Sequence, residues 1–395
     1  MASRFDDLSL DELQARRSEK WDRYPPDVLP AWIAEMDVDV APPIRETLLA
    51  AVERSDFGYA GALGVPGAFC EFAARRFGWQ VPEDRVFVAA DVMVGIAEAL
   101  RLGTNPGDGV VINTPVYPPF FEAIPTGARQ IVEVPLLETE RGWELDLHGL
   151  ERAFREGARA YLLCNPHNPT GRVFARTELE RVAELADRHG VFVIADEIHS
   201  PLVLPGAAHT PYGELGDEAA GRSVTLTGAS KAWNLPGLKC GLIVAGSDSV
   251  RDELRPRARP LLDQTGLLGV FATEAAFREG EPWLDELLVH LHGNRRYLSE
   301  LLAERLPGVR YRPPEASYLA WLDCGALGLG ADPAAFFLEH GRVALSRGLD
   351  FGAEGAGFVR LNMGTSSQLM TETVNRMRTA LTEASPSTPA TTRSR

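Results

Sequence analysis

Short apolar runs alternate with segments of helical periodicity along most of the chain. Apolar runs predict buried strands at residues 86–89, 110–113, 131–135, 160–164, 191–195, 223–226 and 242–244. Between them, residues 66–77, 94–102, 147–156 and 178–189 carry apolar positions at helical spacing. Continuous apolar strands that alternate with helices are typical of a sheet covered on both faces, so the pattern predicts an α/β fold with a mostly parallel sheet.

The pattern changes after about residue 245 and at both ends of the chain. Residues 254–302 are predicted to be largely helical with proline interruptions, and strands at 318–322 and 358–363 flank a helix at 333–340. The expected division is an N-terminal arm at 1–45 that is part of the small domain, a large domain at 46–285, a small C-terminal α/β domain at 286–384 and a disordered tail at 385–395.

Composition excludes several classes of function. The 395 residues hold 40 Lys and Arg against 55 Asp and Glu, a net charge of −15, which argues against a nucleic-acid surface. No apolar run is long enough for a transmembrane helix, and the charged first 20 residues do not resemble a secretory signal. The four widely spaced cysteines favour a reducing cytoplasm and predict neither disulfides nor a metal site.

Three polar clusters directly follow predicted strands. Lys231 comes after a strand and a run of small residues, Asp196 ends a fully apolar strand, and Asn168 lies in the constrained turn NPHNPTG at 165–171. His199 follows Asp196 by three residues and could face the same pocket. Each cluster also has a structural interpretation, as a solvated lysine, a helix cap, a plain loop or a structural histidine. Ligands of parallel sheets bind at the carboxyl ends of strands, which favours a shared site.

Taken together, these clusters resemble the fold-type-I pyridoxal 5′-phosphate (PLP) enzymes, the aspartate aminotransferase superfamily. More narrowly, the chain resembles the MalY/PatB group of cystathionine β-lyases and related aminotransferases. The resemblance rests on WIAEMD at 32–37, PVYPPF at 115–120, NPHNPTG at 165–171, DEIHS at 196–200, SKAWNLPGL at 230–238 and FVRLN at 358–362. It implies a large PLP-binding domain at 46–285 with a mostly parallel sheet, followed by the smaller α/β domain.

The resemblance also assigns cofactor contacts. It implies that Lys231 binds PLP as a Schiff base and moves the substrate Cα proton, and that Asp196 keeps the ring nitrogen protonated. The other implied contacts are Asn168 to the phenolate oxygen, His199 where many relatives use tyrosine, Tyr117 stacked on the ring, and the phosphate ligands Val92 and Met93 (backbone amides), Thr227, Ser230 and Lys239.

The substrate contacts follow from the same resemblance. Arg360 would hold the α-carboxylate bidentately, and Trp32 and Ala34 in the arm would close over the substrate. Tyr59 resembles a tyrosine that relatives donate from the neighbouring subunit, which implies a homodimer with shared active sites. Relatives often have glycine where this chain has Asp91, and the Asp91 carboxylate is expected to point away from the phosphate. Arg347 is a further basic residue to which no role is assigned.

The resemblance implies a cytoplasmic carbon–sulfur β-lyase that cleaves L-cystathionine or a related cysteine S-conjugate to a thiol, pyruvate and ammonia. Two alternatives stay open, a PLP-dependent aminotransferase acting on an L-amino acid with the same residues, and a regulatory protein on the same fold. Lys231, Asp196 and Arg360 are all present, which argues against an inactive scaffold. The expected partners are a small amino-acid substrate and a second copy of the chain, with no nucleic acid and no membrane.

Overall fold

A seven-stranded mixed sheet forms the centre of the larger region of the molecule. The computed structural model describes residues 4–384, and the tail predicted at 385–395 lies outside them. The strand order is β2-β10-β9-β8-β7-β3-β4, and β10 is antiparallel to both of its neighbours while the other pairs are parallel. The strands are β2 (Val86–Ala89), β3 (Gly109–Ile112), β4 (Gln130–Glu133), β7 (Ala160–Cys164), β8 (Phe192–Asp196), β9 (Ser223–Thr227) and β10 (Gly241–Ala245).

Helices cover both faces of this sheet because successive strand side chains point to opposite sides. Tyr161 and Leu163 pack with α7 and α8 in one buried cluster, whereas Leu162 and Ile194 pack with α5 and α6 in another. The helices of this region are α3 (Pro42–Glu53), α4 (Val65–Phe77), α5 (Val92–Gly103), α6 (Phe120–Thr126), α7 (Leu147–Arg155), α8 (Arg176–His189), α9 (Asp217–Gly221), α10 (Asp248–Leu254), α11 (Ala258–Leu262) and α12 (Leu267–Glu279).

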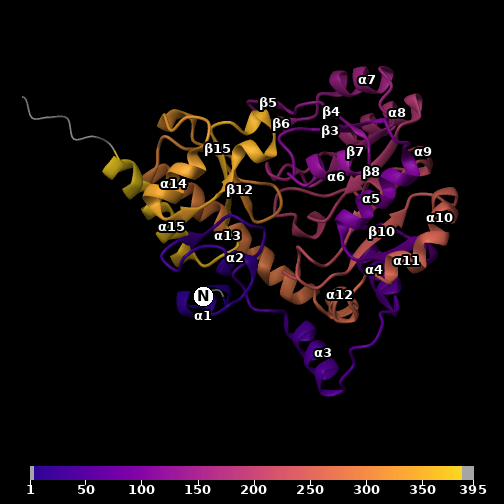
Figure 1. The fold of residues 1–395 in the computed structure, drawn as a ribbon, viewed down its shortest axis with the longest axis horizontal. Coiled ribbons are helices and arrows are strands. Elements are labelled where there is room, and N and C mark those ends of the chain that lie inside the picture. The colour runs from indigo at the N-terminus through magenta and orange to yellow at the C-terminus, as the bar shows by residue number, and fades with distance from the viewer. Residues whose placement is uncertain (1–3, 385–395) are drawn as a thin grey trace, which may run out of the picture.

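A smaller region lies to the left in Figure 1 and is built on an antiparallel four-stranded sheet of order β11-β12-β15-β14. The long helix α13 (Glu281–Arg305) runs between the two regions, and α3 projects away from the rest of the molecule. The remaining elements here are β11 (Arg310–Tyr311), β12 (Leu319–Asp323), β14 (Ser346–Arg347), β15 (Phe358–Asn362), α14 (Pro333–Gly341) and α15 (Ser367–Ala384).

The N-terminal arm joins the smaller region. Its elements are α1 (Leu10–Gln14), α2 (Glu19–Asp22) and β1 (Leu29–Pro30), and β1 pairs in parallel with β13 (Val343–Ala344). The boundaries predicted at 45/46 and 285/286 fall inside α3 and α13, so the proposed domain division stays a prediction. Short 3-10 helices lie at Arg4–Asp6, Glu83–Arg85, Ser200–Leu202, Tyr212–Glu214, Arg255–Arg257, Gly325–Leu327, Gly348–Phe351 and Ala353–Gly355.

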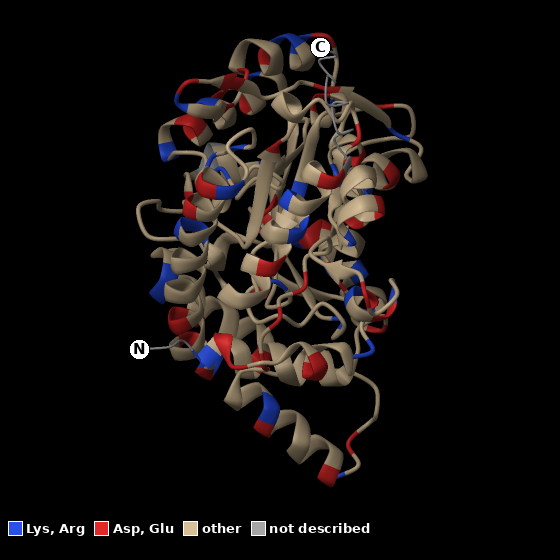
Figure 2. Cartoon of the chain, turned by 90° about the vertical axis from the view of Figure 1, so that its left-hand side faces the viewer, with Lys and Arg blue, Asp and Glu red and all other residues tan. Residues whose placement is uncertain are grey.

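The predicted α/β architecture is confirmed, with two features that the hydropathy pattern did not predict. One is the antiparallel direction of β10, and the other is a small hairpin of β5 (Leu137–Thr139) and β6 (Gly142–Glu144). No helix of residues 4–384 is both long and apolar enough to span a bilayer. Acidic and basic positions are mixed over the helices of the face seen in Figure 2.

Candidate active site

A cavity of about 210 Å³ opens at the carboxyl ends of β7 and β8. Cys164 and Asp196, the last residues of these strands, are neighbours in the sheet and both line the cavity. Residues from six separate stretches of the chain therefore meet here, as the strand–helix alternation predicted. The predicted site residues on its wall are Ala34, Val92, Met93, Tyr117, Asn168, Asp196, His199, Ser230, Lys231 and Lys239.

Four predicted residues do not line the cavity. Thr227 is buried at the end of β9, and Arg360 is connected to the cavity through its contact with Asn168. Trp32 contacts Arg360 through its main-chain carbonyl and not through its indole ring. Tyr59 is 98% exposed in the single chain and contributes nothing to this cavity.

Asp196 is a buried carboxyl group at the floor of the cavity. Its Oδ1 accepts a hydrogen bond of 3.1 Å from the Ile198 amide. Burial raises the pKa of Asp196 to about 7, while the Ile198 amide and the charge of Lys231 act in the opposite direction. A cationic partner would stabilise the ionised form of this buried carboxyl group. A protonated ring nitrogen is a partner of this kind.

Lys231 follows β9 and reaches into the same cavity. Its Nζ donates to the carbonyl oxygen of Ala34 at 3.4 Å. Withdrawal from water lowers the pKa of the Lys231 amine to about 8, and the charge of Arg360 acts in the same direction. A lysine with this pKa offers more neutral amine at neutral pH than a solvated lysine, so it is suited to nucleophilic attack and to proton transfer.

His199 provides a neutral imidazole beside Lys231. Its side chain is buried, and Nδ1 has no hydrogen-bond partner within residues 4–384. Burial lowers the pKa of His199 to about 3, with further contributions from the charges of Lys231 and Arg360. The imidazole is therefore uncharged at neutral pH and keeps one buried ring nitrogen available for a ligand.

Arg360 lies on β15 and bridges the two regions of the molecule. One guanidinium nitrogen donates to Asn168 Oδ1 at 3.0 Å, and the other donates to the Trp32 carbonyl at 3.0 Å and to Ser346 Oγ at 3.1 Å. Burial lowers the pKa of Arg360 to about 10, so the side chain stays charged at neutral pH. Arg360 has no carboxylate partner within residues 4–384, and a buried cation of this kind is suited to binding an anionic ligand.

Residues 31–37, which we call the strap, form a bent segment outside helices and strands that borders the cavity at Ala34 and is held by side chains of both regions. The side chain of Asn234 bonds both main-chain groups of Met36, accepting from the amide at 2.7 Å and donating to the carbonyl at 2.8 Å. Asn362 Nδ2 donates to the carbonyls of Ile33 and Glu35, and the Tyr318 hydroxyl donates to the Ala34 carbonyl at 3.0 Å. The strap thus meets the site through its peptide groups.

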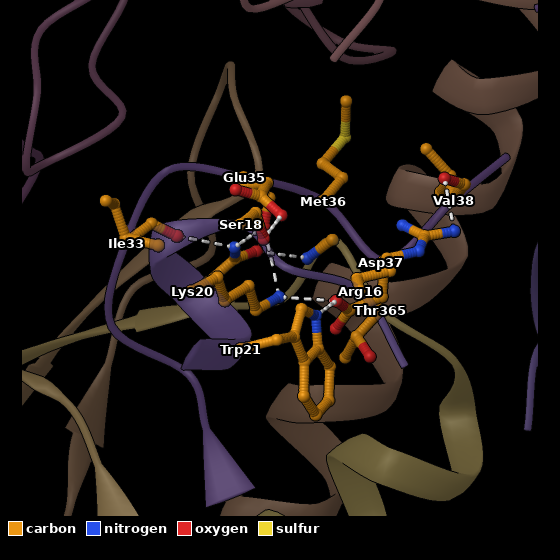
Figure 3. A network of polar contacts seen from close by, with 12 residues as sticks. Arg16, Ser18, Lys20, Trp21, Ile33, Glu35, Met36, Asp37, Val38 and Thr365 are labelled. Atoms are coloured by element: carbon orange, nitrogen blue, oxygen red, sulfur yellow. Dashed lines mark hydrogen bonds and ion pairs between the residues drawn. The ribbon is translucent and has the colours of Figure 1, made fainter. Parts of the chain in front are cut away.

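A buried ion pair anchors the far end of the strap, as Figure 3 shows. Lys20 Nζ lies 2.7 Å from Asp37 Oδ1 and also donates to the Glu35 carbonyl at 3.0 Å. The Trp21 indole donates to the same Asp37 oxygen at 3.1 Å, and the Ser18 hydroxyl donates to Glu35 Oε1 at 2.6 Å. The short helix α2 and its N-cap Ser18 therefore fix residues 35–37.

Asp91 lies at the N-terminus of α5, where the backbone amides of Val92 and Met93 were predicted to bind phosphate. Its Oδ1 accepts from the Val94 amide at 2.9 Å, and its Oδ2 accepts from Lys239 Nζ at 2.8 Å. The carboxylate caps the N-terminus of α5, and Asp91 is one of the residues that line the cavity. Lys239 thus has a carboxylate partner within the chain.

Sequence reasoning did not identify the side chains that hold the strap. Asn234 and Asn362 lie inside recognised motifs, three residues after Lys231 and two after Arg360, yet their partners are peptide groups of the distant arm. Lys20, Asp37 and Tyr318 were missed for the same reason. Nothing in the sequence around Lys20 indicates that its side chain is buried beside Glu35 and Asp37.

Comparisons with known proteins agree with this geometry. Residues 34–377 match the model of the family "Aminotransferase class I and II". The cystathionine beta-lyase PatB of Bacillus subtilis is 36% identical, covering 95% of this chain and 100% of the relative. The cystathionine beta-lyase of Corynebacterium glutamicum is also 36% identical, covering 94% and 99%. The crystal structure of cystalysin from Treponema denticola, which contains pyridoxal 5′-phosphate, superposes with a TM-score of 0.90 at 28% identity, covering 97% and 100%.

Proposed function

The chain belongs to the family of class I and II aminotransferases, and we propose from that premise that it is a PLP-dependent carbon–sulfur β-lyase. Its substrate is L-cystathionine or a related cysteine S-conjugate. The enzyme catalyses the reaction of this substrate with water to give a thiol, pyruvate and ammonia. The observation that carries the proposal is the 36% identity, over nearly the whole length, to two cystathionine beta-lyases. The fold expected from the sequence, that of the fold-type-I PLP enzymes, is confirmed by the superposition on cystalysin.

The cofactor is pyridoxal 5′-phosphate, and the chemistry of the cavity fits its parts. Asp196 has the carboxylate that a protonated ring nitrogen needs, and the buried His199 Nδ1 has no partner in the described part of the chain. Tyr117 lines the same cavity, and the N-terminus of α5 offers amides for the phosphate. When bound, PLP supplies an aldehyde that reacts with amines and a ring that withdraws electrons from the adjacent carbon.

Lys231 is the group that we assign to covalent attachment and to transfer of the Cα proton. Its lowered pKa keeps part of the amine neutral near pH 7, as a base requires. The Ala34 carbonyl accepts a hydrogen bond of 3.4 Å from Nζ and can hold the amine in place in both of its protonation states. The strap therefore positions the proton-transferring atom as well as bordering the cavity.

Arg360 is assigned to the substrate α-carboxylate. The hydrogen bonds to Asn168, Ser346 and the strap hold the guanidinium plane in one orientation. A fixed bidentate donor orients the whole α-carbon, which decides the bond that is presented for cleavage. This residue also discourages loss of the carboxylate as CO₂, because the cation stabilises the charged group.

A second copy of the chain is proposed to complete the site. Tyr59 is almost fully exposed, and large apolar side chains around it on α3 and the following loop are also uncovered. A patch of this kind on a soluble enzyme favours a protein partner. These exposed side chains are Leu49, Val52, Phe57 and Leu63. Tyr59 would then enter the cavity of the partner subunit, and the enzyme would work as a homodimer in the cytoplasm.

The test of the proposed function is product formation from L-cystathionine without any added keto acid. The purified enzyme should release pyruvate, ammonia and a free thiol in equal amounts, and Lys231→Ala should release none. Visible absorbance of the bound cofactor should accompany the active protein and be lost in the variant. If the amino group leaves only when a keto acid is supplied and consumed, the enzyme is an aminotransferase and the lyase proposal fails.

A further inference from the structure

The carboxylate of Asp91 is fully engaged at the place where an anion would bind. One oxygen caps α5 through the Val94 amide, and the other is paired with Lys239 at 2.8 Å. These partners, together with the Met93 amide, lower the pKa of Asp91 in spite of its partial burial. The side chain is therefore ionised at neutral pH and contributes a full negative charge to the cavity wall.

The backbone of Asp91 packs closely against the neighbouring strand β10. Asp91 lies against the start of β10 so closely that a Cβ on Gly241 would lie 2.8 Å from the Asp91 carbonyl carbon. Asp91, Val92, Met93, Lys239 and Gly241 all line the same cavity as Lys231. A phosphate that binds the amides of Val92 and Met93 thus meets a negative charge on the adjoining residue.

Two lysines are the cations on the described part of the cavity wall, Lys231 and Lys239. Lys231 is assigned to the aldehyde of the cofactor, so Lys239 is the cation left for the phosphate. In this structure Lys239 is paired with Asp91, and both side chains are partly open to solvent. A phosphate can gain Lys239 only by sharing it with the carboxylate, and like charges at short range oppose each other.

We propose that Asp91 is a resident anion that competes with the cofactor phosphate for Lys239 at the N-terminus of α5. The pair sets the affinity for PLP below the value that the helix terminus and Lys239 would give alone. Lys239 has two tasks in this arrangement, neutralising Asp91 and attracting the phosphate. The inference rests on the proposed function in one respect, namely that PLP is the cofactor.

The test is the dissociation constant of PLP for the full-length protein after removal of the cofactor, measured by absorbance and tryptophan fluorescence. Asp91→Asn removes the charge but keeps a residue that caps helices equally well. It should bind PLP at least about threefold more tightly than the wild type. Lys239→Met should bind at least about tenfold more weakly, because it leaves Asp91 unpaired beside the phosphate. The loss caused by Lys239→Met should be smaller in an Asp91→Asn background.

Two controls isolate the phosphate. Asp332 offers a matched carboxylate, because it caps α14 through the Ala335 amide and pairs with Arg347 at 2.8 Å, away from the cavity. Asp332→Asn should leave the affinity for PLP unchanged. Pyridoxal, which lacks the phosphate, should bind wild type and Asp91→Asn equally. Repeating the series in Lys231→Ala removes the covalent bond, so that the non-covalent contacts alone determine the affinity.

The outcomes separate this inference from the proposed function. If the wild type binds PLP but Asp91→Asn binds it no more tightly, the competition is absent and the inference is overturned while the function stands. Equal tightening for pyridoxal and PLP would also overturn it, because the effect would then not involve the phosphate. Wild-type protein that binds no PLP would instead overturn the proposed function itself.

Discussion

Lys20 and Asp37 form an ion pair of 2.7 Å with side chains that are only 1% and 4% exposed. The pair joins α2 to the end of the strap, and both partners have further hydrogen bonds to the Glu35 carbonyl and the Trp21 indole. Burying two charges is costly unless each is satisfied, and here both are. The pair therefore fixes the path of the strap where it leaves the cavity.

Replacement of Lys20 by methionine should destabilise the protein strongly, because Asp37 would remain buried without a cation. We expect the free energy of unfolding to fall by about 3–5 kcal/mol, measured by denaturant titration. The matched control is Arg259→Met, which breaks a pair with Asp263 of the same 2.7 Å length at 66% and 50% exposure. That variant should lose less than about 1 kcal/mol, and similar losses in both would contradict the role of burial.

Arg360→Lys should impair substrate binding while cofactor binding persists. Lysine keeps the charge but cannot offer a carboxylate two parallel donors or hold Asn168 and the Trp32 carbonyl together. The KM for L-cystathionine should rise about 10- to 100-fold, with the visible cofactor absorbance retained. Arg347→Lys, on neighbouring β14, should leave KM unchanged, since Arg347 pairs with Asp332 and Asp350. Loss of the cofactor absorbance in Arg360→Lys would refute the assignment.

The cofactor-free protein should show a pH-dependent stability that originates at Asp196. Burial raises the pKa of this carboxyl from 3.8 to about 7. The folded chain thus keeps a proton that the unfolded chain loses, so the stabilisation present at low pH is lost as pH rises from about 4 to about 7. As the pH rises from about 5 to about 8, the free energy of unfolding of Asp196→Asn should increase by about 3 kcal/mol relative to that of the wild type.

This difference is measured by denaturant unfolding of both cofactor-free proteins at the two pH values. The charge of Asp196 raises the pKa of Lys231, and the charge of Lys231 lowers the pKa of Asp196, so the measured difference includes the coupling of these two groups. A stability difference that does not change with pH would show that Asp196 is ionised throughout. The free energy of unfolding of PLP-bound wild type, relative to that of the cofactor-free protein, should also increase over this pH range. The reason is that the protonated ring nitrogen stabilises the Asp196 carboxylate.

Subunits with different defects should restore each other if Tyr59 acts across the dimer interface. Lys231→Ala and Tyr59→Ala should each be nearly inactive alone. A mixed dimer holds one site with both residues intact, so random pairing should recover about a quarter of the wild-type activity. Activity is measured as pyruvate release after co-expression, with each variant paired with itself as the control. Mixed dimers that remain inactive would mean that Tyr59 serves its own subunit.

Much of the fold could be predicted because its strands are continuous apolar runs bounded by turns. The strands at 86–89 and 160–164 were predicted with the bounds that the structure has. The antiparallel direction of β10 could not be predicted, since an apolar run looks the same in a parallel and in an antiparallel strand. The hairpin of β5 and β6 escaped notice because its side chains are largely exposed or half-buried and show no apolar run.

The candidate site divides in the same way. Asp196 and Lys231 were found because each follows an apolar strand, and the cavity brings them together. The bonds between Asn234 and Met36 join residues 198 positions apart, and Lys239 lies 148 positions from Asp91. Such pairs carry no pattern in one sequence, since neither partner constrains the residue types around the other.

Trp32 and Ala34 present main-chain carbonyls to Arg360 and Lys231, and every amino acid has this group. The residue types of this segment can therefore change during evolution, within the limits of packing, while the main-chain atoms that contact Lys231 and Arg360 stay the same. Related enzymes can keep these main-chain contacts without sharing the residue types of this segment. Comparing the backbone paths of two structures would then detect the relationship where comparing residue identities would not.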